Sequence, residues 1–489
     1  MVNEQQDRPE VRAQSDSFKH AIVLGGSLTG LLTARVLADH FETVTLIERD
    51  GYPETAEARK GIPQANHVHA LLLRGRQILE QLFPGLQDEM IADGAPLVDM
   101  AKEIAWFNPA GWGVKFPSDL MVLSFTRPLL DLHIRKRLQQ NPKIRILENT
   151  RVIALAPHKD RRRVAGVIIP EPREDSDRVV GQTLLADLIL DTTGRSSSAP
   201  KWLRDLGFDS PTETTVDAHL GYASRLYKIP DDFDADWLCA ILQRAPPHGN
   251  RGGLIFRVEG ERWLVTLVGG GNERPPADEE GFLEFVRNLP DPIIYDAIKH
   301  AEPLSAIKTH RSTQNRLRHF ELMKSLPANF LLLGDSVCAF NPVYGQGMTV
   351  AAIGVMALDQ TLREYKSRNL DRLSSTFQKR LAKLNKAPWM MATSEDFRFP
   401  ETEGDSPSFA TRLMHKYMDQ VMRLSTHSSE VRDILLRVFN MLLPPAALFR
   451  PTILFRVLYQ LTKARADATT RKERKRVRTW TKAQETKSI

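Results

Sequence analysis

The sequence is poor in cysteine. Only Cys239 and Cys338 occur among its 489 residues, and they lie far apart along the chain. Two isolated cysteines cannot supply the disulfide framework of a small secreted domain or a cysteine-rich metal centre, and such sparse cysteine is typical of a reducing compartment. The sequence therefore predicts a cytoplasmic protein without a metal site.

Long apolar runs are also missing. A membrane-spanning helix needs about 20 consecutive apolar residues, but the richest stretch, residues 434–461, is interrupted by arginines and prolines. Residues 1–16 are polar and charged, without the apolar segment of a secretory signal. Neither a spanning helix nor a secretory leader is expected.

An excess of positive charge is confined to one end of the chain. The net charge is +7, from 67 Lys and Arg against 60 Asp and Glu. Residues 463–489 contain ten of the basic and three of the acidic residues, so the whole excess lies in this tail and the remainder carries 57 charges of each sign. A balanced body is not the footprint of a nucleic-acid-binding protein, and no nucleic-acid partner is expected.

The basic tail and the amphipathic segment 431–461 before it leave two interpretations open. One is a helical subdomain packed on the rest of the protein and followed by a solvated tail. The other is peripheral contact with a membrane surface. We favour the packed subdomain because Pro444, Pro445 and Pro451 are typical of short helices that end early.

The first chemical motif is a glycine-rich turn. Apolar residues 21–24 and 44–47 predict two buried strands around a helix, and Gly25-Gly-Ser-Leu-Thr-Gly30 joins the first strand to that helix. In a dinucleotide-binding unit the first glycine permits the tight turn, the last permits close packing, and the helix N-terminus binds a pyrophosphate. Glu48 is placed to accept from a ribose hydroxyl. Ser27 replaces the second glycine, which predicts a slightly displaced pyrophosphate; a turn that binds nothing is the alternative.

The second motif is more specific. An apolar strand over 330–333 delivers Asp335 to its end, where a carboxylate can accept from a sugar hydroxyl. Asn341-Pro-Val-Tyr-Gly-Gln-Gly-Met348 follows and opens a helix over 348–365. Gly345 and Gly347 let the backbone approach a flat ring, and the helix N-terminus can stabilise negative charge on it.

The order of predicted elements indicates one fold interrupted by another, as a chain too long for one core requires. Helices are expected over 68–83 and 124–140, a strand over 184–190, and an antiparallel hairpin from strands 254–258 and 263–267. The fold class is α/β: a Rossmann-like domain interleaved with an antiparallel β-sheet substrate domain, plus a C-terminal helical part. The expected boundaries are 17–85, 125–200 and 311–386 for the first domain, 86–124 and 201–310 for the second, 387–462 for the helical part and 463–489 for the basic tail.

Further segments resemble the class A flavin monooxygenases of the para-hydroxybenzoate hydroxylase fold. Ala186-Asp-Leu-Ile-Leu-Asp191-Thr-Thr-Gly194-Arg195 is similar to that family's second fingerprint. Arg59-Lys-Gly61 resembles the segment in which an arginine reaches the cofactor, and Arg127 stands where a side chain contacts the flavin. Within the family, residues 59–69 and 339–348 are similar to the epoxidases that act on polyene precursors of polyether natural products, enzymes of secondary metabolism.

The resemblance implies FAD as cofactor, with NAD(P)H and O2 as co-substrates. A flavin C4a-hydroperoxide would transfer one oxygen atom to a hydrophobic small molecule, by epoxidation of an alkene or polyene or by hydroxylation. Because the flavin supplies the chemistry, no protein acid or base is named as catalytic. The expected cofactor-binding residues are Gly25, Gly26, Ser27, Leu28, Thr29, Gly30, Glu48, Arg49, Arg59, Arg127, Val152, Asp191, Gly334, Asp335, Pro342, Gly345, Gly347 and Met348.

The substrate pocket is expected between the Val343-Tyr344 loop and the sheet that carries Phe256, Trp263 and Val265, although these apolar positions also suit a core. His67 and His69 are interpreted as pocket-lining or structural rather than metal ligands. Two other functions stay open: a geranylgeranyl-reductase-like flavin reductase that saturates isoprenoid double bonds, and a non-catalytic escort-type binding protein.

Overall fold

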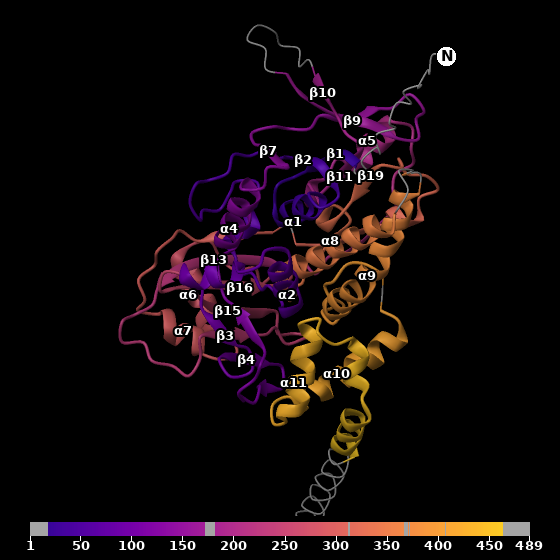
Figure 1. Cartoon of the computed structure of the whole chain (residues 1–489). Coiled ribbons are helices and arrows are strands. Elements are labelled where there is room, and N and C mark those ends of the chain that lie inside the picture. Colours follow the sequence, from indigo (N-terminus) through magenta and orange to yellow (C-terminus); the bar gives the residue numbers. More distant parts are fainter. Residues whose placement is uncertain are drawn as a thin grey trace, which may run out of the picture.

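The computed structural model (Figure 1) describes residues 18–171, 181–311, 313–365, 370, 372–405 and 407–462. Residue 17, at the start of the expected dinucleotide-binding domain, and the basic tail 463–489 lie outside the described residues. Across the described ranges, no helix combines the length and apolar composition needed to cross a bilayer.

A five-stranded parallel sheet forms the first layer. Its strand order is β19-β11-β1-β2-β7, and every neighbouring pair is parallel. The chain therefore contributes to this sheet from three separate stretches. The strands are β1 Phe18–Leu24, β2 Phe41–Ile47, β7 Ile144–Leu147, β11 Leu188–Asp191 and β19 Phe330–Leu332.

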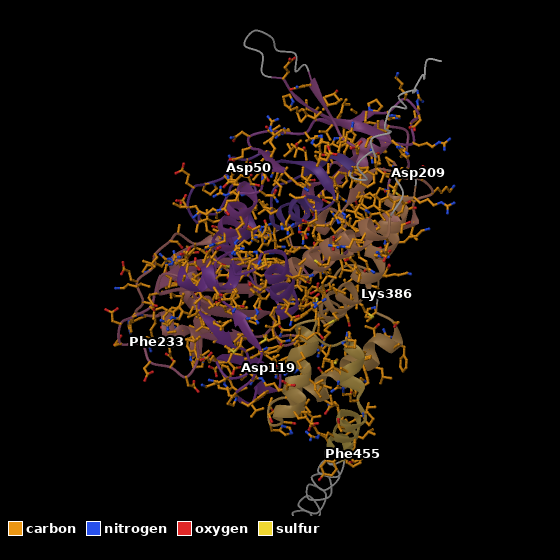
Figure 2. The ribbon with its side chains drawn as sticks, in the orientation of Figure 1. Asp50, Asp119, Asp209, Phe233, Lys386 and Phe455 are labelled. Atoms are coloured by element: carbon orange, nitrogen blue, oxygen red, sulfur yellow. The ribbon has the colours of Figure 1, made fainter. Side chains whose placement is uncertain are left out.

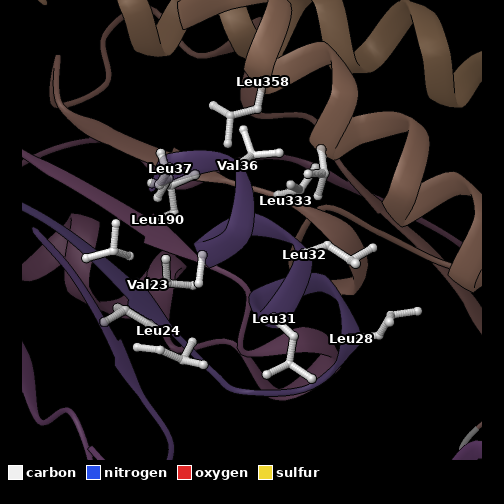
Figure 3. Close-up of a cluster of buried hydrophobic side chains, with 14 of the residues drawn as sticks. Val23, Leu24, Leu28, Leu31, Leu32, Val36, Leu37, Leu190, Leu333 and Leu358 are labelled. Carbon is white, nitrogen blue, oxygen red and sulfur yellow. The ribbon is translucent and has the colours of Figure 1, made fainter. Parts of the chain in front are cut away.

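The main core lies between this sheet and its helices. Helix α1 (Leu28–Leu37) is buried along most of its length, because it lies against the sheet and also contacts α8 (Gly347–Glu364) and α4 (Arg127–Gln139). Figure 3 shows side chains of α1 converging with those of the strands and α8. The labelled residues are Val23, Leu24, Leu28, Leu31, Leu32, Val36, Leu37, Leu190, Leu333 and Leu358.

The second layer is a seven-stranded sheet, in the order β17-β13-β16-β15-β14-β4-β5. Its pairs are antiparallel except for β14 with β4, and α6 (Glu279–Arg287) and α7 (Ile293–Ile298) supply the apolar residues that cover one face. The predicted combination of a Rossmann-like fold with an interleaved antiparallel sheet is confirmed. The strands are β4 Ile104–Asn108, β5 Gly111–Trp112, β13 Gly221–Lys228, β14 Cys239–Leu242, β15 Arg251–Val258, β16 Arg262–Gly269 and β17 Lys308–His310.

The β15–β16 hairpin forms as predicted, but its side chains face differently. The register pairs Phe256 with Leu264 and Ile255 with Val265, and directly opposed residues share a face. Trp263 and Val265 therefore point toward α6 and α7, while Phe256 lies on the other face. Of the three residues expected on the sheet beside the pocket, Trp263 and Val265 thus take the alternative role as core, and Phe256 lies on the opposite face.

Two further predicted boundaries are corrected. The expected helix 68–83 begins only at Leu73 (α2, Leu73–Leu82). The expected strand 184–190 is two strands in two sheets, β10 (Gly181–Leu185) and β11, because the chain turns at Asp187, whose carboxylate accepts from the amides of Lys19 and His20 at 3.0 Å each.

Three small sheets and several short helices complete the body. The sheets are β8 Ala154–Pro157 with β9 Val164–Pro170 and β10; β12 Glu213–Val216 with β18 Asn315–Arg318 and β20 Cys338–Ala339; and β3 Leu97–Asp99 with β6 Met121–Leu123. The short helices are α3 Leu86–Ala92, α5 Ala199–Asp205, η1 Pro63–Asn66, η2 Gly194–Ser196, η3 Phe320–Leu322, η4 Gly334–Ser336 and η5 Pro342–Tyr344.

Helices fill the C-terminal part of the described chain. They are α9 (Leu373–Asp396), α10 (Phe409–Leu424), α11 (Ser429–Phe439), η6 (Pro445–Phe449) and a last helix over residues 451–462. The expected boundary between residues 386 and 387 falls inside α9, which continues through Pro388. In Figure 1, α10, α11 and the last helix lie at the end of the molecule opposite β10, while α9 lies beside α8.

Candidate functional site

The glycine-rich turn begins directly after β1. Gly25 has φ +92°, a conformation that other residues rarely adopt, and a Cβ there would lie 2.9 Å from the Thr192 carbonyl oxygen. A Cβ on Gly30 would lie 1.8 Å from the Gly25 oxygen. The predicted roles of Gly25 in the turn and of Gly30 in close packing are confirmed.

Positive charge gathers at the N-terminus of α1. Ser27 is the N-cap residue, but its hydroxyl makes no capping bond. Instead it lies 3.0 Å from Nη2 of Arg127, the first residue of α4. Arg127 is only 5% exposed and also pairs with Asp131 at 2.8 Å. Asp131 compensates the charge of Arg127, while the free N–H groups at the α1 N-terminus and the Nη2 side of the guanidinium still suit an anion.

Glu48 ends β2 and faces the same turn. One of its oxygens accepts from the Gly26 amide at 2.7 Å and the other from the Asp50 amide at 3.0 Å, and Arg59 Nη1 lies 3.3 Å away. A carboxylate has about four acceptor positions, so these contacts leave room for one further hydroxyl. Glu48 thus fixes the turn as well as facing a ligand, a second role that the sequence did not indicate.

A small cleft with about 20 Å³ of interior space opens beside Arg59, between residues 52–65 and α4. Arg59 donates to the Gly26 carbonyl at 2.8 Å and stacks on the Tyr52 ring at 4.3 Å. The Tyr52 hydroxyl donates to the same carbonyl. The Arg135 guanidinium also lies over the Tyr52 ring, 5.0 Å from its centre. The sequence analysis missed Tyr52 and Arg135, since neither belongs to a recognisable motif.

Asp335 lies after β19, at the carboxyl ends of the parallel strands. Gly334 before it has φ +67°, and a Cβ there would meet Thr29 Oγ1 at 2.7 Å. The Asp335 side chain is 39% exposed and stands 4.0 Å from Arg195. Burial among the surrounding protein raises the pKa of Asp335, while the nearby guanidinium groups of Arg195, Arg127 and Arg316 oppose that rise. The carboxylate therefore lies in a positively charged recess, close to the α1 turn.

Asp191 was predicted to contact the cofactor, and in the structure its oxygens accept hydrogen bonds from within the protein. It is fully buried, and its oxygens accept from the Thr193 amide at 2.8 Å, from the Ser197 hydroxyl and from the Ser336 hydroxyl at 3.3 Å. Because Ser336 follows Asp335 directly, Asp191 positions the loops on both sides of the recess. A direct cofactor contact would require it to give up these bonds.

The second motif packs where the recess meets α8. Gly345 has φ +62°, and a Cβ there would lie 2.9 Å from the Ala70 side chain. A Cβ on Gly347, the first residue of α8, would meet nothing within 4 Å. Two buried amide oxygens, Asn341 Oδ1 and Gln346 Oε1, have no hydrogen-bond partner among the described residues. Open space and unpaired acceptors at a helix N-terminus fit the approach of a flat polar ring.

A buried carboxylate on α9 holds this segment in place. Asp396, which has no exposed surface, accepts from Tyr344 Oη at 2.9 Å and from the amides of Asn341 and Asn315 at 2.6 Å each. Arg244, from the second sheet's loop, lies 4.0 Å away. Burial raises the pKa of Asp396 to about 6, against the attraction of Arg244 and these hydrogen bonds. Sequence reasoning missed Asp396, because its partners lie at least 52 positions away.

His67 forms a polar chain across the second sheet. Its Nδ1 lies 2.7 Å from Ser224 Oγ, which lies 2.6 Å from Thr266 Oγ1; the latter accepts from the Val68 amide at 2.9 Å. The ring nitrogen and the two hydroxyls thus form one continuous chain of hydrogen bonds, whose direction depends on the tautomer of His67. Nε2 is buried without a partner among the described residues.

Both histidines of this segment are neutral at physiological pH. Burial lowers the pKa of His67 to about 3, with smaller contributions from His310 and His69. Burial and then Arg127 lower the pKa of His69 to about 4. Within the ranges that the structure describes, no three His, Cys, Asp or Glu side chains come together in a metal-binding arrangement.

The four expected pocket residues separate. Val343 packs on the second sheet with Leu220, Tyr222 and Leu254, whereas Tyr344 turns toward α9. Phe256 packs with Val98, Ile104 and Val68, on the sheet face nearest His67. Trp263 is 1% exposed and lies in the core with Phe233 and Trp237, so its assignment to the pocket is wrong.

The remaining expected cofactor residues differ widely in exposure. Leu28 is core and Met348 is 7% exposed, while the Arg49 side chain is 51% exposed. Val152 packs against the main core, beside Thr150, whose amide donates to the Glu48 carbonyl. Pro342 begins η5.

Comparison with known proteins gives one curated relative. No family model matches the chain. The chain is 30% identical to "Protein Rv3254" of Mycobacterium tuberculosis over 430 residues, which is 86% of this chain and 90% of the relative.

Solved structures share the fold at low identity. The flavin-dependent brominase Bmp2 has a TM-score of 0.63 at 13% identity and covers 91% of this chain and 100% of its own. PqsL, a probable FAD-dependent monooxygenase from Pseudomonas aeruginosa, has a TM-score of 0.58 at 16% identity, over 78% and 97%. The halogenase CndH, described as myxobacterial, has a TM-score of 0.56 at 14% identity, over 88% and 98%. The chain has the fold of these flavin-dependent proteins.

Proposed function

Since the chain belongs to the same family as Protein Rv3254 of Mycobacterium tuberculosis, we propose a function for it from the residues of its own site. It is an FAD-dependent monooxygenase that inserts one oxygen atom from O2 into a hydrophobic small molecule, with NAD(P)H as reductant. The reaction is epoxidation of an alkene or polyene, or hydroxylation.

The observation that carries this proposal is the row of complementary groups along the carboxyl ends of the parallel strands. The α1 N-terminus and Arg127 offer positive charge to a pyrophosphate. Glu48 has an acceptor position left for a ribose hydroxyl, beside the cleft at Arg59, and Asp335 can accept from a ribityl hydroxyl. These roles remain predictions, but the residues present fit FAD.

The α8 end of the row suits the redox-active ring. Gly347 leaves open space in front of the helix, whose N–H groups stabilise negative charge. Asn341 and Gln346 offer buried acceptors. When bound, FAD would take electrons from NAD(P)H and pass oxygen from O2 to the substrate. The protein's own task is to hold the ring, exclude water and orient the substrate.

The substrate side is mainly apolar, and the Tyr222 hydroxyl and His67 are polar groups within it. Val343, Tyr222 and Leu254 form an apolar cluster where the ring-side loop meets the second sheet. His67, buried close to Tyr222 with their ring centres 5.8 Å apart, presents an unpaired nitrogen of a neutral ring. A neutral polar group in an apolar setting suits one uncharged hydroxyl or carbonyl group on an otherwise hydrocarbon substrate. Peripheral contact with a lipid surface is compatible with such a substrate.

Oxygen labelling is the experiment that tests this function. The purified protein with excess FAD should become yellow, and NADPH consumption with candidate polyenes should require O2. The product should gain one oxygen atom from ¹⁸O₂. A product that gains two hydrogens without label, formed best without air, would identify the reductase instead. A protein that takes up no FAD would support the escort-type function instead.

Asp335→Ala tests the site itself. It should weaken FAD binding by about 1–3 kcal/mol, because a cofactor hydroxyl would lose its acceptor in a partly desolvated recess. The matched control is Asp209→Ala at an exposed surface position, which should bind FAD as the unmodified protein does. Equal FAD affinity in both variants, measured by quenching of flavin fluorescence, would remove Asp335 from the site.

A further inference from the structure

The last described helix exposes large apolar side chains along one face. Phe455 is 72% exposed, Leu458 61% and Tyr459 63%, at the spacing of neighbouring turns of a helix. Ile453 and Val457, on the opposite face, are buried in the core of the C-terminal helices. Ile453 and Val457 therefore attach this helix to the rest of the protein, and the exposed apolar side chains take no part in that packing. Figure 2 shows Phe455 at the end of the molecule, away from the main body.

A second helix carries a similar face. In α10, Phe409 is 76% exposed and Leu413, one turn later, 59%. Further along the same helix, Tyr417 stacks on Phe449 with ring centres 4.8 Å apart, and Phe449 immediately precedes the last helix. The exposed apolar residues of the two helices are thus linked through an aromatic pair. Isolated exposed apolar residues are ordinary, but a contiguous group marks an interaction surface. We call these exposed residues of α10, η6 and residues 451–462 the C-terminal apolar face.

Positive charge accompanies this face. Arg412 and Lys416 are exposed on α10 next to Phe409 and Leu413. The chain continues past the face for 27 residues, 463–489, which contain ten Lys and Arg and three Asp and Glu, and whose one aromatic residue is Trp480. The charges of the rest of the chain balance. Basic residues beside exposed aromatic and aliphatic side chains are the composition of a surface that binds anionic lipid.

We propose that the C-terminal apolar face docks on an anionic lipid bilayer, with Phe455, Leu458 and Phe409 entering the interface and the basic residues contacting lipid headgroups. A second copy of the chain is the less suitable occupant, because a symmetric pairing would bring two tails of the same charge together. The tail itself has too few apolar residues to cover the face. This inference goes beyond the proposed function and does not depend on it.

Vesicle co-sedimentation of the full-length chain tests the inference. The unmodified protein should sediment with phosphatidylcholine vesicles in which about a third of the lipid is phosphatidylglycerol, and about tenfold less with phosphatidylcholine alone. Salt at about 0.5 M should weaken the binding by screening. The double variant Phe455→Ser/Leu458→Ser should lose most of the binding. Replacing Lys472, Arg474, Lys475 and Arg476 with Gln should abolish the preference for anionic lipid.

The matched control removes equally exposed apolar surface elsewhere. Leu185 is 66% exposed on β10, at the other end of the molecule, and Leu322 is 70% exposed. The variant Leu185→Ser/Leu322→Ser should bind vesicles as the unmodified protein does. Thermal unfolding of both double variants checks that each is folded. Equal binding of the face variant and the control, or no binding to either vesicle, would overturn the inference. A dimer that only the face variant disrupts, measured by light scattering without vesicles, would assign the face to a second copy instead.

Discussion

Asp396 is a single carboxylate that joins four distant parts of the chain. Its oxygens accept from Tyr344 and Asn341 in the ring-side segment and from Asn315 in β18, and Arg244 of the second sheet lies 4.0 Å away. A fully buried carboxylate is costly when ionised and inexpensive when protonated. The group that orders the proposed ring site therefore also makes it sensitive to pH.

The pH dependence of stability should report this group. Burial raises the pKa of Asp396 from 3.8 to about 6, so the folded state favours the protonated form. Its stabilising contribution is complete below about pH 4 and is lost as the pH rises through about 6, by an amount on the order of 3 kcal/mol. In urea unfolding, the free energy of unfolding of the unmodified protein relative to Asp396→Asn should decrease by this amount between about pH 4 and pH 7. His67 and His69, whose pKa burial lowers, change stability in the opposite direction, but they do so in both proteins and cancel in the difference.

Asp209 provides the comparison for that experiment. It is exposed at the surface (Figure 2), so Asp209→Asn should keep the pH profile of the unmodified protein. An identical profile in Asp396→Asn and the unmodified protein would show that Asp396 does not titrate in this range. The ring-side segment would then be held by a permanently charged network.

At the scale of elements, a substitution at the N-terminus of α8 is the most direct test of the proposed ring site. A Cβ on Gly347 would meet nothing within 4 Å, so a side chain can start there without a clash at its first atom. It would instead occupy the space offered to the ring. Gly347→Val should therefore lower turnover by about a hundredfold or more while FAD content falls much less, because the α1 turn and Arg127 bind the other end of the cofactor. The ratio of flavin to protein absorbance, measured beside turnover, separates these effects.

The control for Gly347→Val lies in the same motif. Gly345 has φ +62°, and a Cβ there would lie 2.9 Å from the Ala70 side chain, so Gly345→Val strains the backbone and should lower stability as well as activity. Should Gly347→Val lose flavin in proportion to activity, as a misfolded site would, Gly347 would be a folding residue without a ring-side role.

Elements with local causes were predictable from the sequence. The β1-α1-β2 unit follows from apolar runs, a glycine turn and an acid within about 30 residues, and the structure has each of them in place. Periodicity did not predict which face of a hairpin is covered: the three-residue turn after Val258 sets the register, and this places Trp263 opposite Arg257, away from Phe256.

Interactions between distant segments were not predictable. No local pattern connects Asp396 with Asn315, and Asp191 was assigned to the cofactor because its motif does not show that Ser197 and Ser336 occupy its oxygens. Likewise the break between β10 and β11 depends on amides of β1, more than 160 positions earlier. Tertiary hydrogen bonds decide these points, and they leave little trace in the sequence of either partner.

At the scale of the whole molecule, the two sheets are tied together by their connectivity. The chain leaves the parallel sheet after β11, builds most of the second sheet, and returns to add β19. The first sheet thus lacks its edge strand β19 and its covering helix α8 until the chain has passed through the second sheet. Segment 67–72 adds a further link, since the Val68 amide donates to Thr266 in the second sheet and the Leu72 amide to Thr349 in α8.

This connectivity predicts that the described domains unfold together. Trp237 and Trp263 are buried in the core of the second sheet, whereas Trp202 is buried in the main core. Tryptophan fluorescence of a variant that keeps only Trp237 and Trp263 therefore follows the second layer, while release of flavin follows the first. Both signals should change at the same urea concentration. Excess FAD at about 100 times its Kd should raise the stability seen by both signals by about 2.7 kcal/mol, since ligand bound to one part stabilises the whole cooperative unit. Two separated transitions, with only the flavin signal shifted by FAD, would mean that the layers fold independently despite the interleaved chain.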